Sequence, residues 1–303
     1  MKDLIFSRNS ENTSLSMAQI FNRAPAVFSE TQSESLTDRY SQITTADAID
    51  ILRDYGYKPV QAAQVNPTKA DQNHVLHYLA FAQPGDDPST REQGRPEIIL
   101  YNSHDGKNTL RLYAGFFRWV CSNSLAAGEG FEIKARHSKA TAANFETMIQ
   151  ETAGKLPTLQ HQIESLRSSQ PTANRIQAFA EAAAQLRWAN VESSLEAALW
   201  STSPMKPGSY STDETVTDLM GNNCAGYDRG SDAWRIFNRV QEKLMRGGAQ
   251  VLSMTQKNPR GIHRTARGLT NVDAALRLNR GLWDLAQEHL TDTHRRIKLR
   301  AFA

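Results

Sequence analysis

The residues best suited to chemistry lie in the segment Tyr101-Asn102-Ser103-His104-Asp105-Gly106 and at His137. Histidine and aspartate side chains bind metal ions or transfer protons, and neighbouring strand ends can bring them together. His104, Asp105 and His137 are therefore candidate catalytic residues of a metal-dependent nuclease or hydrolase. The segment also fits a hairpin turn in which Asp105 bonds the backbone, Gly106 supplies a positive φ and His104 faces solvent. Because the spacing matches no zinc or hydrolase pattern, we favour the turn and expect no metal site.

Other patterns for catalysis or cofactor binding are weak. Cys121 lies in an apolar stretch without a local His–Asp signature, which is typical of a buried thiol. The segment Gly128-Glu129-Gly130 lacks a further glycine, and no Gly-Lys-Ser or Gly-Lys-Thr occurs, so we expect neither nucleotide hydrolysis nor a cofactor. With only two cysteines, the chain has no disulfide framework and suits a reducing compartment.

Cationic and aromatic residues gather in the middle of the chain. Bases stack on aromatic rings with about 1 to 3 kcal/mol each, while cations pair with phosphates, so this mixture suits single-stranded nucleic acid. The alternative is that the strand aromatics belong to the core. The candidate cations are Arg111, Arg118, Lys134 and Arg136, and the candidate aromatics are Tyr113, Phe117 and Trp119.

The C-terminal part is strongly basic. Residues 229–303 contain 15 Lys and Arg against 6 Asp and Glu, a balance of +9, which leaves −6 for residues 1–228. A basic surface of this kind attracts polyanions. The alternative is a solvated helix face whose long cationic side chains cover apolar surface and bind no partner. The candidate nucleic-acid contacts are Arg235, Arg239, Lys243 and Arg246 along one side of a helix, followed by Arg260, Arg264 and Arg267 in a loop flanked by glycine and proline.

Hydrophobic periodicity predicts an α+β fold, an antiparallel β-meander backed by helices, with a mainly helical basic C-terminal part. The expected strands are Lys58 to Val65, His74 to Gln83, Glu97 to Asn102, Thr109 to Asn123 and Phe131 to His137. The expected helices are Thr44 to Tyr55, Thr141 to Gly154, Leu156 to Ser169, Thr172 to Trp188, Val191 to Trp200, Asp213 to Met220, Asp232 to Arg246 and Asn271 to His294.

The expected organisation has four parts. These are a polar N-terminal arm at 1–42, an α+β core with long helices at 43–200, a loop at 201–230 and a basic helical part at 231–303 that packs on the core. The arm carries the apolar cluster Ala24-Pro25-Ala26-Val27-Phe28, which we expect to pack on a neighbouring subunit in a homo-oligomer, with docking on its own chain as the competing account. No signal peptide or membrane span is evident, so we expect a cytoplasmic protein.

Several blocks together resemble a phage- and plasmid-associated family known as domain of unknown function 932. They are Ala24 to Phe28, Tyr40 with Thr44, Gly56 to Val60, Asn102 to Gly106, Arg118 to Asn123, Trp234 to Glu242, Arg246 to Gly248, and Leu278-Asn279 with Leu282-Trp283. The resemblance spans nearly the whole chain and implies an association with prophages, conjugative plasmids and genomic islands, but it transfers no activity. The expected elements also resemble the core of ring-forming single-strand annealing proteins, in architecture alone.

The leading functional hypothesis is a nucleic-acid-binding protein of mobile elements that prefers single-stranded DNA and acts in recombination, replication or DNA protection. It needs no catalysis and no cofactor. One alternative is a counter-defence protein that binds a host protein, and another is the metal-dependent nuclease or hydrolase described above.

Overall fold

The computed structural model describes residues 14–31, 33, 36, 41, 43–65, 71–85, 94–117, 124–126, 131–188, 228, 230–255, 258–269 and 272–292. The chain divides into two compact units, residues 1–160 and 161–303. The expected helices Val191 to Trp200 and Asp213 to Met220 lie outside the described residues. None of the described helices is long and apolar enough to cross a membrane.

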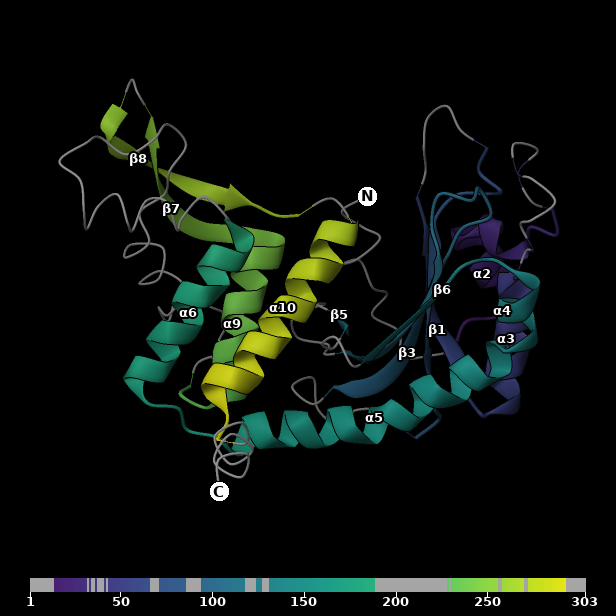
Figure 1. Cartoon of the computed structure of the whole chain (residues 1–303), viewed down its shortest axis with the longest axis horizontal. Coiled ribbons are helices and arrows are strands. Elements are labelled where there is room, and N and C mark those ends of the chain that lie inside the picture. The colour runs from purple at the N-terminus through teal and green to yellow at the C-terminus, as the bar shows by residue number, and fades with distance from the viewer. Residues whose placement is uncertain are drawn as a thin grey trace. The chain divides into compact units, whose positions relative to one another are not determined.

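Unit 1 is built on an antiparallel sheet, which confirms the α+β meander (Figure 1). Its strands are β1 (Lys58–Gln64), β2 (His77–Ala82), β3 (Arg95–Asn102), β4 (Leu110–Phe117), β5 (Ser124–Ala126) and β6 (Glu132–Ala135). They pair in the order β1-β2-β3-β4-β5, and β6 also pairs with β4. A strand is found within each expected range, although residues 118–123 of the expected strand Thr109 to Asn123 lie outside the described residues, and β5 is added beside the end of β4.

The sheet has one apolar face and one face rich in aromatic and charged residues. Leu79, Leu100 and Leu112 lie in register across β2, β3 and β4 and are fully buried at 0% exposure. On the other face, Tyr101 stacks on Tyr78 at 5.4 Å between ring centroids and meets Tyr113 edge-on at 5.6 Å. Side chains alternate between faces along a strand, so a one-residue change of register would exchange the two sets.

Short helices gather on one side of this sheet: α2 (Met17–Arg23), the 3-10 helix η1 (Pro25–Phe28), α3 (Thr45–Asp54) and α4 (Lys139–Ala143) (Figure 1). Ser16 and Gln19 form a capping box that starts α2, and the Thr44 side chain accepts from the Asp47 amide to start α3 as expected. Ala24, Ala26 and Val27 are fully buried. The amide of Ala26 donates to Gln64 Oε1 of β1 at 2.9 Å, so this cluster docks on its own unit.

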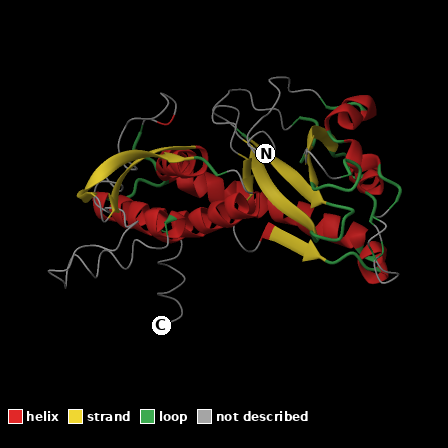
Figure 2. Ribbon diagram, turned by 90° about the horizontal axis from the view of Figure 1, so that it is seen from above, coloured by secondary structure: helices red, strands yellow, loops and turns green. Residues whose placement is uncertain are grey.

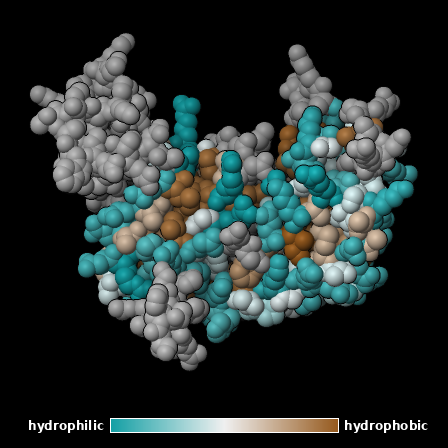
Figure 3. Space-filling view, in the orientation of Figure 1, coloured by the Kyte–Doolittle hydropathy of each residue, from teal (hydrophilic) through white to brown (hydrophobic). Residues whose placement is uncertain are grey.

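The expected helices Thr141 to Gly154 and Leu156 to Ser169 are instead a single helix, α5 (Phe145–Ser168), with Pro157 inside it. Proline usually interrupts a helix because it lacks an N–H. Here the buried residues continue at three- and four-residue spacing across it: Phe145, Ile149, Thr152, Leu156, Leu159, Ile163 and Leu166. Pro157 itself is exposed. Figure 3 shows hydrophilic and neutral side chains along most of the outer side of α5.

Unit 2 contains the helices α6 (Ala173–Arg187), α9 (Ala233–Arg246) and α10 (Val272–Leu290), which pack together (Figure 1). Phe237 stacks on Trp234 at 5.8 Å and meets Trp283 edge-on at 5.7 Å, so the apolar stripe of α9 is packing, as the pattern predicts. The guanidinium of Arg175 donates to the carbonyls of His289 and Thr291 at the end of α10. This contact satisfies carbonyls that a helix C-terminus leaves free.

The segment expected to be a basic loop after α9 is a β-ribbon. Gly247 ends the helix, as expected, and strand β7 (Gly247–Thr255) then pairs antiparallel with β8 (Asn258–Arg267). Figure 2 shows the two strands as a curved ribbon. The glycine and proline signals concealed the short β-prone stretches Val251 to Thr255 and Ile262 to Thr265. Pro259 near the start of β8 is tolerated because a terminal strand position need not donate to a neighbour.

Candidate functional site

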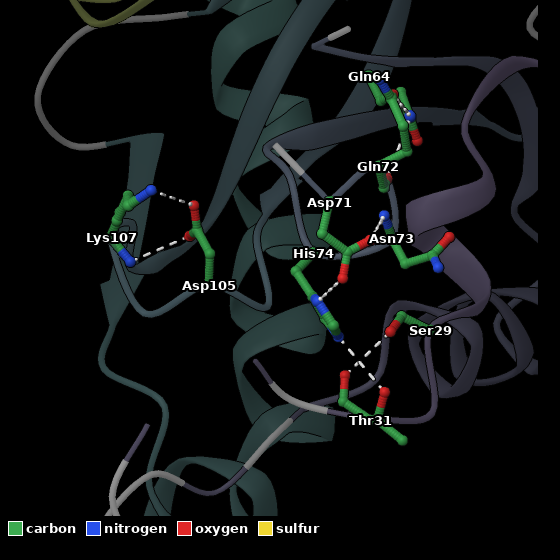
Figure 4. Close-up of polar contacts among 9 residues, drawn as sticks. All are labelled: Ser29, Thr31, Gln64, Asp71, Gln72, Asn73, His74, Asp105 and Lys107. Carbon is green, nitrogen blue, oxygen red and sulfur yellow. Dashed lines mark hydrogen bonds and ion pairs between the residues drawn. The ribbon is translucent and has the colours of Figure 1, made fainter. Parts of the chain in front are cut away.

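The segment Asn102 to Gly106 forms the connection between β3 and β4. The Asp105 carboxylate accepts from Ser103 Oγ at 2.7 Å and from the Lys107 amide at 3.1 Å. Gly106 has a φ of 71°, in the left-handed region. Figure 4 shows the Asp105 carboxylate turned toward Lys107, whose Nζ lies 3.6 Å from it. These contacts are those of a turn, in which a short acidic side chain replaces missing backbone bonds.

His104 does not face solvent, contrary to our expectation from the sequence. It is fully buried, at 0% exposure, and its ring lies 5.1 Å from that of His77. Neither ring nitrogen meets a partner of ordinary hydrogen-bond geometry among the described residues. Burial, and then the neighbouring His77, His137 and His74, lower the pKa of His104 to about 3, while the Ala26 backbone acts weakly in the opposite direction. His104 is therefore neutral at physiological pH.

His77 is also buried, but its hydrogen bonds are complete. Nδ1 lies 2.9 Å from the Val75 carbonyl, to which only an N–H can donate, so Nε2 is the acceptor for the Thr45 hydroxyl at 2.7 Å. Asn102 Nδ2 donates to the same hydroxyl and to the Ile43 carbonyl. Burial lowers the pKa of His77 to about 4. The geometry thus holds a neutral imidazole with one fixed tautomer.

His137 completes this group from the segment after β6. It is buried at 8% exposure, and burial lowers its pKa to about 4. Like charges would repel within the group, since His137 disfavours protonation of both His77 and His104. Among the residues that the structure describes, no set of three or more His, Cys, Asp or Glu side chains is placed to hold a metal ion.

A fourth histidine, His74, lies between Asp71 and Thr31 (Figure 4). Its Nδ1 is 2.6 Å from Asp71 Oδ2, and its Nε2 is 3.4 Å from Thr31 Oγ1. A hydroxyl, an imidazole and a carboxylate in series resemble a nucleophile relay. Thr31 is exposed and Asp71 is half-exposed, and Asp71 also accepts from the Asn73 amide at 2.9 Å in a local turn. We therefore assign the series to holding Thr31 in place.

We call residues 14–45 the N-terminal segment. His74, His77, His104 and His137 each contact a residue between Thr31 and Thr45 of this segment, and we call them the histidine clamp. The His104 carbonyl accepts from the Ser33 amide at 3.1 Å, and the His137 carbonyl accepts from the Ser41 amide at 3.5 Å. His74 and His77 contact Thr31 and Thr45 through their rings. The sequence signal for the clamp was the number of histidines in or beside the strands β2, β3 and β6, although neither their spacing nor any motif indicated what they would contact.

Three of the four candidate cations of the sheet, Arg111, Lys134 and Arg136, lie on β4 and β6 or directly after β6. Arg111 on β4 lies directly opposite Lys134 on β6, and Arg136 follows the end of β6. Lys134 and Arg136 are exposed, and Arg111 is half-buried. The candidate aromatics Tyr113 and Phe117 are buried, at 0% and 1% exposure, and Arg118 and Trp119 lie outside the described residues. Tyr113 donates to Glu132 Oε1 at 2.8 Å, and burial and this carboxylate raise its pKa.

The α9 cations share one side of the helix, but not one environment. Arg239 and Lys243 are buried, at 5% and 8% exposure, and Arg239 donates to the Asp228 carbonyl at 3.3 Å. Arg235 pairs with Asp232 at 2.7 Å, and Arg246 lies 3.9 Å from Glu242. The sequence pattern correctly placed these cations on one side of α9. Helical spacing could not indicate that other elements bury Arg239 and Lys243.

The remaining candidates lie on β8. Arg260 and Arg264 are strand residues, with Arg264 opposite Val251, and Arg267 lies exposed at the base of the ribbon opposite Gly247. The structure therefore brings these three arginines together on one strand.

The fold and the clamp define an α+β protein with a histidine-fastened N-terminal segment and a basic, ribbon-bearing helical unit. The chain belongs to the family described as Domain of unknown function (DUF932), whose model matches residues 33–283, which confirms the resemblance found in the sequence. It is 28% identical over 279 residues to the UPF0380 protein YafZ of Escherichia coli (strain K12), covering 91% of this chain and 92% of that protein. It is 28% identical over 281 residues to the UPF0380 protein YfjQ of the same organism, with the same coverage. No solved structure matches the chain.

Proposed function

We propose that the protein binds DNA through its basic C-terminal part and serves a mobile element in recombination, replication or protection of DNA. The observation that carries this proposal is the charge balance of +9 in residues 229–303 against −6 in the rest of the chain. Neutralising phosphates releases counterions, so a concentrated positive charge favours a polyanion over other partners.

The preference for single strands loses part of its support because Tyr113 and Phe117 are buried. The basic residues still support DNA binding. Among the described side chains of residues 229–303, the exposed cations are Arg246, Arg267 and Arg277, and exposure suits them to contact phosphates. Arg239 and Lys243 are better suited to stabilising unit 2, because their side chains lie in its interior.

The test is a gel-shift titration of the full chain against single- and double-stranded DNA over a range of salt concentrations. We expect affinity to fall steeply with salt, and Arg246→Gln with Arg277→Gln to reduce the log–log slope by about two, near one for each phosphate contact. The matched control is Lys58→Gln with Lys139→Gln, which removes two exposed cations from unit 1. Absence of salt-dependent binding would contradict the proposal, and chelator-sensitive DNA cleavage would favour a nuclease.

A further inference from the structure

The β7–β8 ribbon is firmly rooted in unit 2. Strand β7 continues directly from α9 through Gly247, whose φ is 89°. A Cβ at Gly247 would lie 2.6 Å from the Ala266 carbonyl oxygen, and a Cβ at Gly268 would lie 2.4 Å from the Arg246 carbonyl oxygen. The Leu269 amide donates to the Met245 carbonyl at 2.9 Å. Both strands are thus fixed at their base by close backbone approach, which only glycine permits.

Beyond this base, the ribbon extends past the ends of α6 and α9 (Figure 1). In the part of the chain that the structure describes, β7 and β8 pair only with each other. A two-stranded hairpin is marginally stable alone, so its attachment to α9 is what makes it a defined element. Strands of 9 and 10 residues reach about 30 Å at roughly 3.3 Å per residue.

The ribbon contains basic residues but no acidic ones. Residues 247–267 contain the four cations Lys257, Arg260, Arg264 and Arg267, and no Asp or Glu. They also contain no Trp, Tyr or Phe. Single-strand binding surfaces combine cations with aromatic rings on which bases stack. Apart from His263, the ribbon offers cations without aromatic rings, so its chemistry fits a duplex whose bases remain stacked on one another.

We propose that the β7–β8 ribbon binds in the major groove of double-stranded DNA. This inference rests on the proposed function and names its substrate class. The major groove of B-DNA is about 12 Å wide and admits a two-stranded β-ribbon, whose strands lie about 4.8 Å apart. Arginine is the side chain that most often reads guanine there, through O6 and N7. A-form RNA has a deep and narrow major groove that excludes such an element, so DNA is the partner.

The experiment compares a duplex of about 30 base pairs, roughly three helical turns, with a single strand of the same sequence. The ribbon variant is Arg260→Gln with Arg264→Gln in the full chain, and the matched control is Arg246→Gln with Arg277→Gln. We expect the ribbon variant to weaken duplex binding about tenfold or more and single-strand binding about twofold or less, because the two arginines would contact base edges that only a duplex presents in a major groove. The control should weaken both forms similarly. Equal losses on both forms, or a loss confined to the single strand, would overturn the ribbon assignment while leaving DNA binding intact.

A second measurement needs no variant. Dimethyl sulfate methylates guanine N7 in the major groove and adenine N3 in the minor groove, so it reports which groove a bound protein covers. We expect the native protein to protect guanine N7 within its site. Protection confined to adenine N3 would exclude the major groove. If the native protein binds neither DNA form, the proposed function itself fails, a result distinct from wrong-groove or wrong-strand binding.

Discussion

Gly106 provides the test of whether the segment Asn102 to Gly106 acts as a structural turn. Its φ of 71° favours glycine, and a Cβ there would lie 2.3 Å from Leu36 Cδ2. We expect Gly106→Ala to lower the free energy of unfolding by about 1 to 3 kcal/mol, because a side chain in that region is strained and crowded. Urea denaturation measures the change.

The matched control is Gly154→Ala in α5. Gly154 is exposed in a helix with open space around it, so alanine there should raise stability by about 0.5 to 1 kcal/mol. DNA binding should be unchanged in both variants at a temperature where both are folded. A Gly106→Ala protein as stable as the native one would show that the turn does not require its left-handed conformation.

The histidine clamp predicts acid sensitivity. The pKa values of about 4 for His77 and His137 and about 3 for His104 lie below the ordinary value of 6.5. At a pH between the folded-state pKa of each histidine and 6.5, the unfolded chain binds protons that the folded chain does not. The free energy of unfolding therefore falls as the pH decreases below 6.5. Above pH 6.5 this loss vanishes. Each histidine should contribute a loss on the order of 2 kcal/mol between pH 7.5 and 5.

His104→Leu tests this linkage at one site. Leucine fills a similar volume without a titrating group, and the His104 ring nitrogens have no ordinary hydrogen bonds among the described residues that the change would break. The variant should therefore lose less stability between pH 7.5 and 5 than the native protein, by on the order of 2 kcal/mol. His161→Leu, at an exposed position on α5 outside the histidine clamp, is the control, and a change in its pH profile as large as that of His104→Leu would show that the effect is not specific to the clamp. If the free energy of unfolding of His104→Leu varied with pH as in the native protein, His104 would not contribute to the acid sensitivity.

At the scale of elements, Pro157 makes a simple prediction. It lies exposed inside α5, where a proline costs about 3 kcal/mol relative to alanine, and helix continuity is maintained by the buried residues on either side. We expect Pro157→Ala to raise the free energy of unfolding by about 1 to 3 kcal/mol, as measured in urea. A decrease would instead mean that packing in α5 depends on a kink at the proline.

The elements were predictable where local signals agreed with packing. Thr44 starts α3, Gly247 ends α9, and alternation located the strands of the meander. Prediction failed where tertiary contacts outweighed a local signal. Pro157 indicated a helix start, but the apolar stripe continues through it, and Pro259 indicated a loop, although it stands near the start of a strand.

The candidate site was less predictable than the fold. The Asn102 to Gly106 segment was correctly interpreted as a turn, because Asp and Gly determine its local conformation. The burial of His104 depends on Ala26, Ser33 and other residues far away in sequence, which no local pattern encodes. Helical spacing likewise placed Arg239 and Lys243 on one stripe without indicating that the rest of unit 2 would bury them.

At the scale of the whole molecule, the homo-oligomer prediction can no longer rest on the apolar cluster Ala24 to Phe28 as a whole. Ala24, Ala26 and Val27 are buried against their own unit, so they do not need a neighbouring subunit. Phe21 remains 55% exposed and lies 5.8 Å from Phe28, which leaves an aromatic pair at the surface. A second copy of the chain covering this pair would remove apolar area from water at about 25 cal/mol per Å².

Light scattering at micromolar concentration tests the association. We expect the native protein to have a multiple of the subunit mass of 33.8 kDa and Phe21→Ser to shift the mass toward a single subunit. Tyr55→Ser provides the control, because Tyr55 is another exposed aromatic residue, at 38% exposure, but lies at the end of α3. A native mass of 33.8 kDa, with or without DNA, would show that docking of the N-terminal segment on its own sheet leaves no need for a partner subunit.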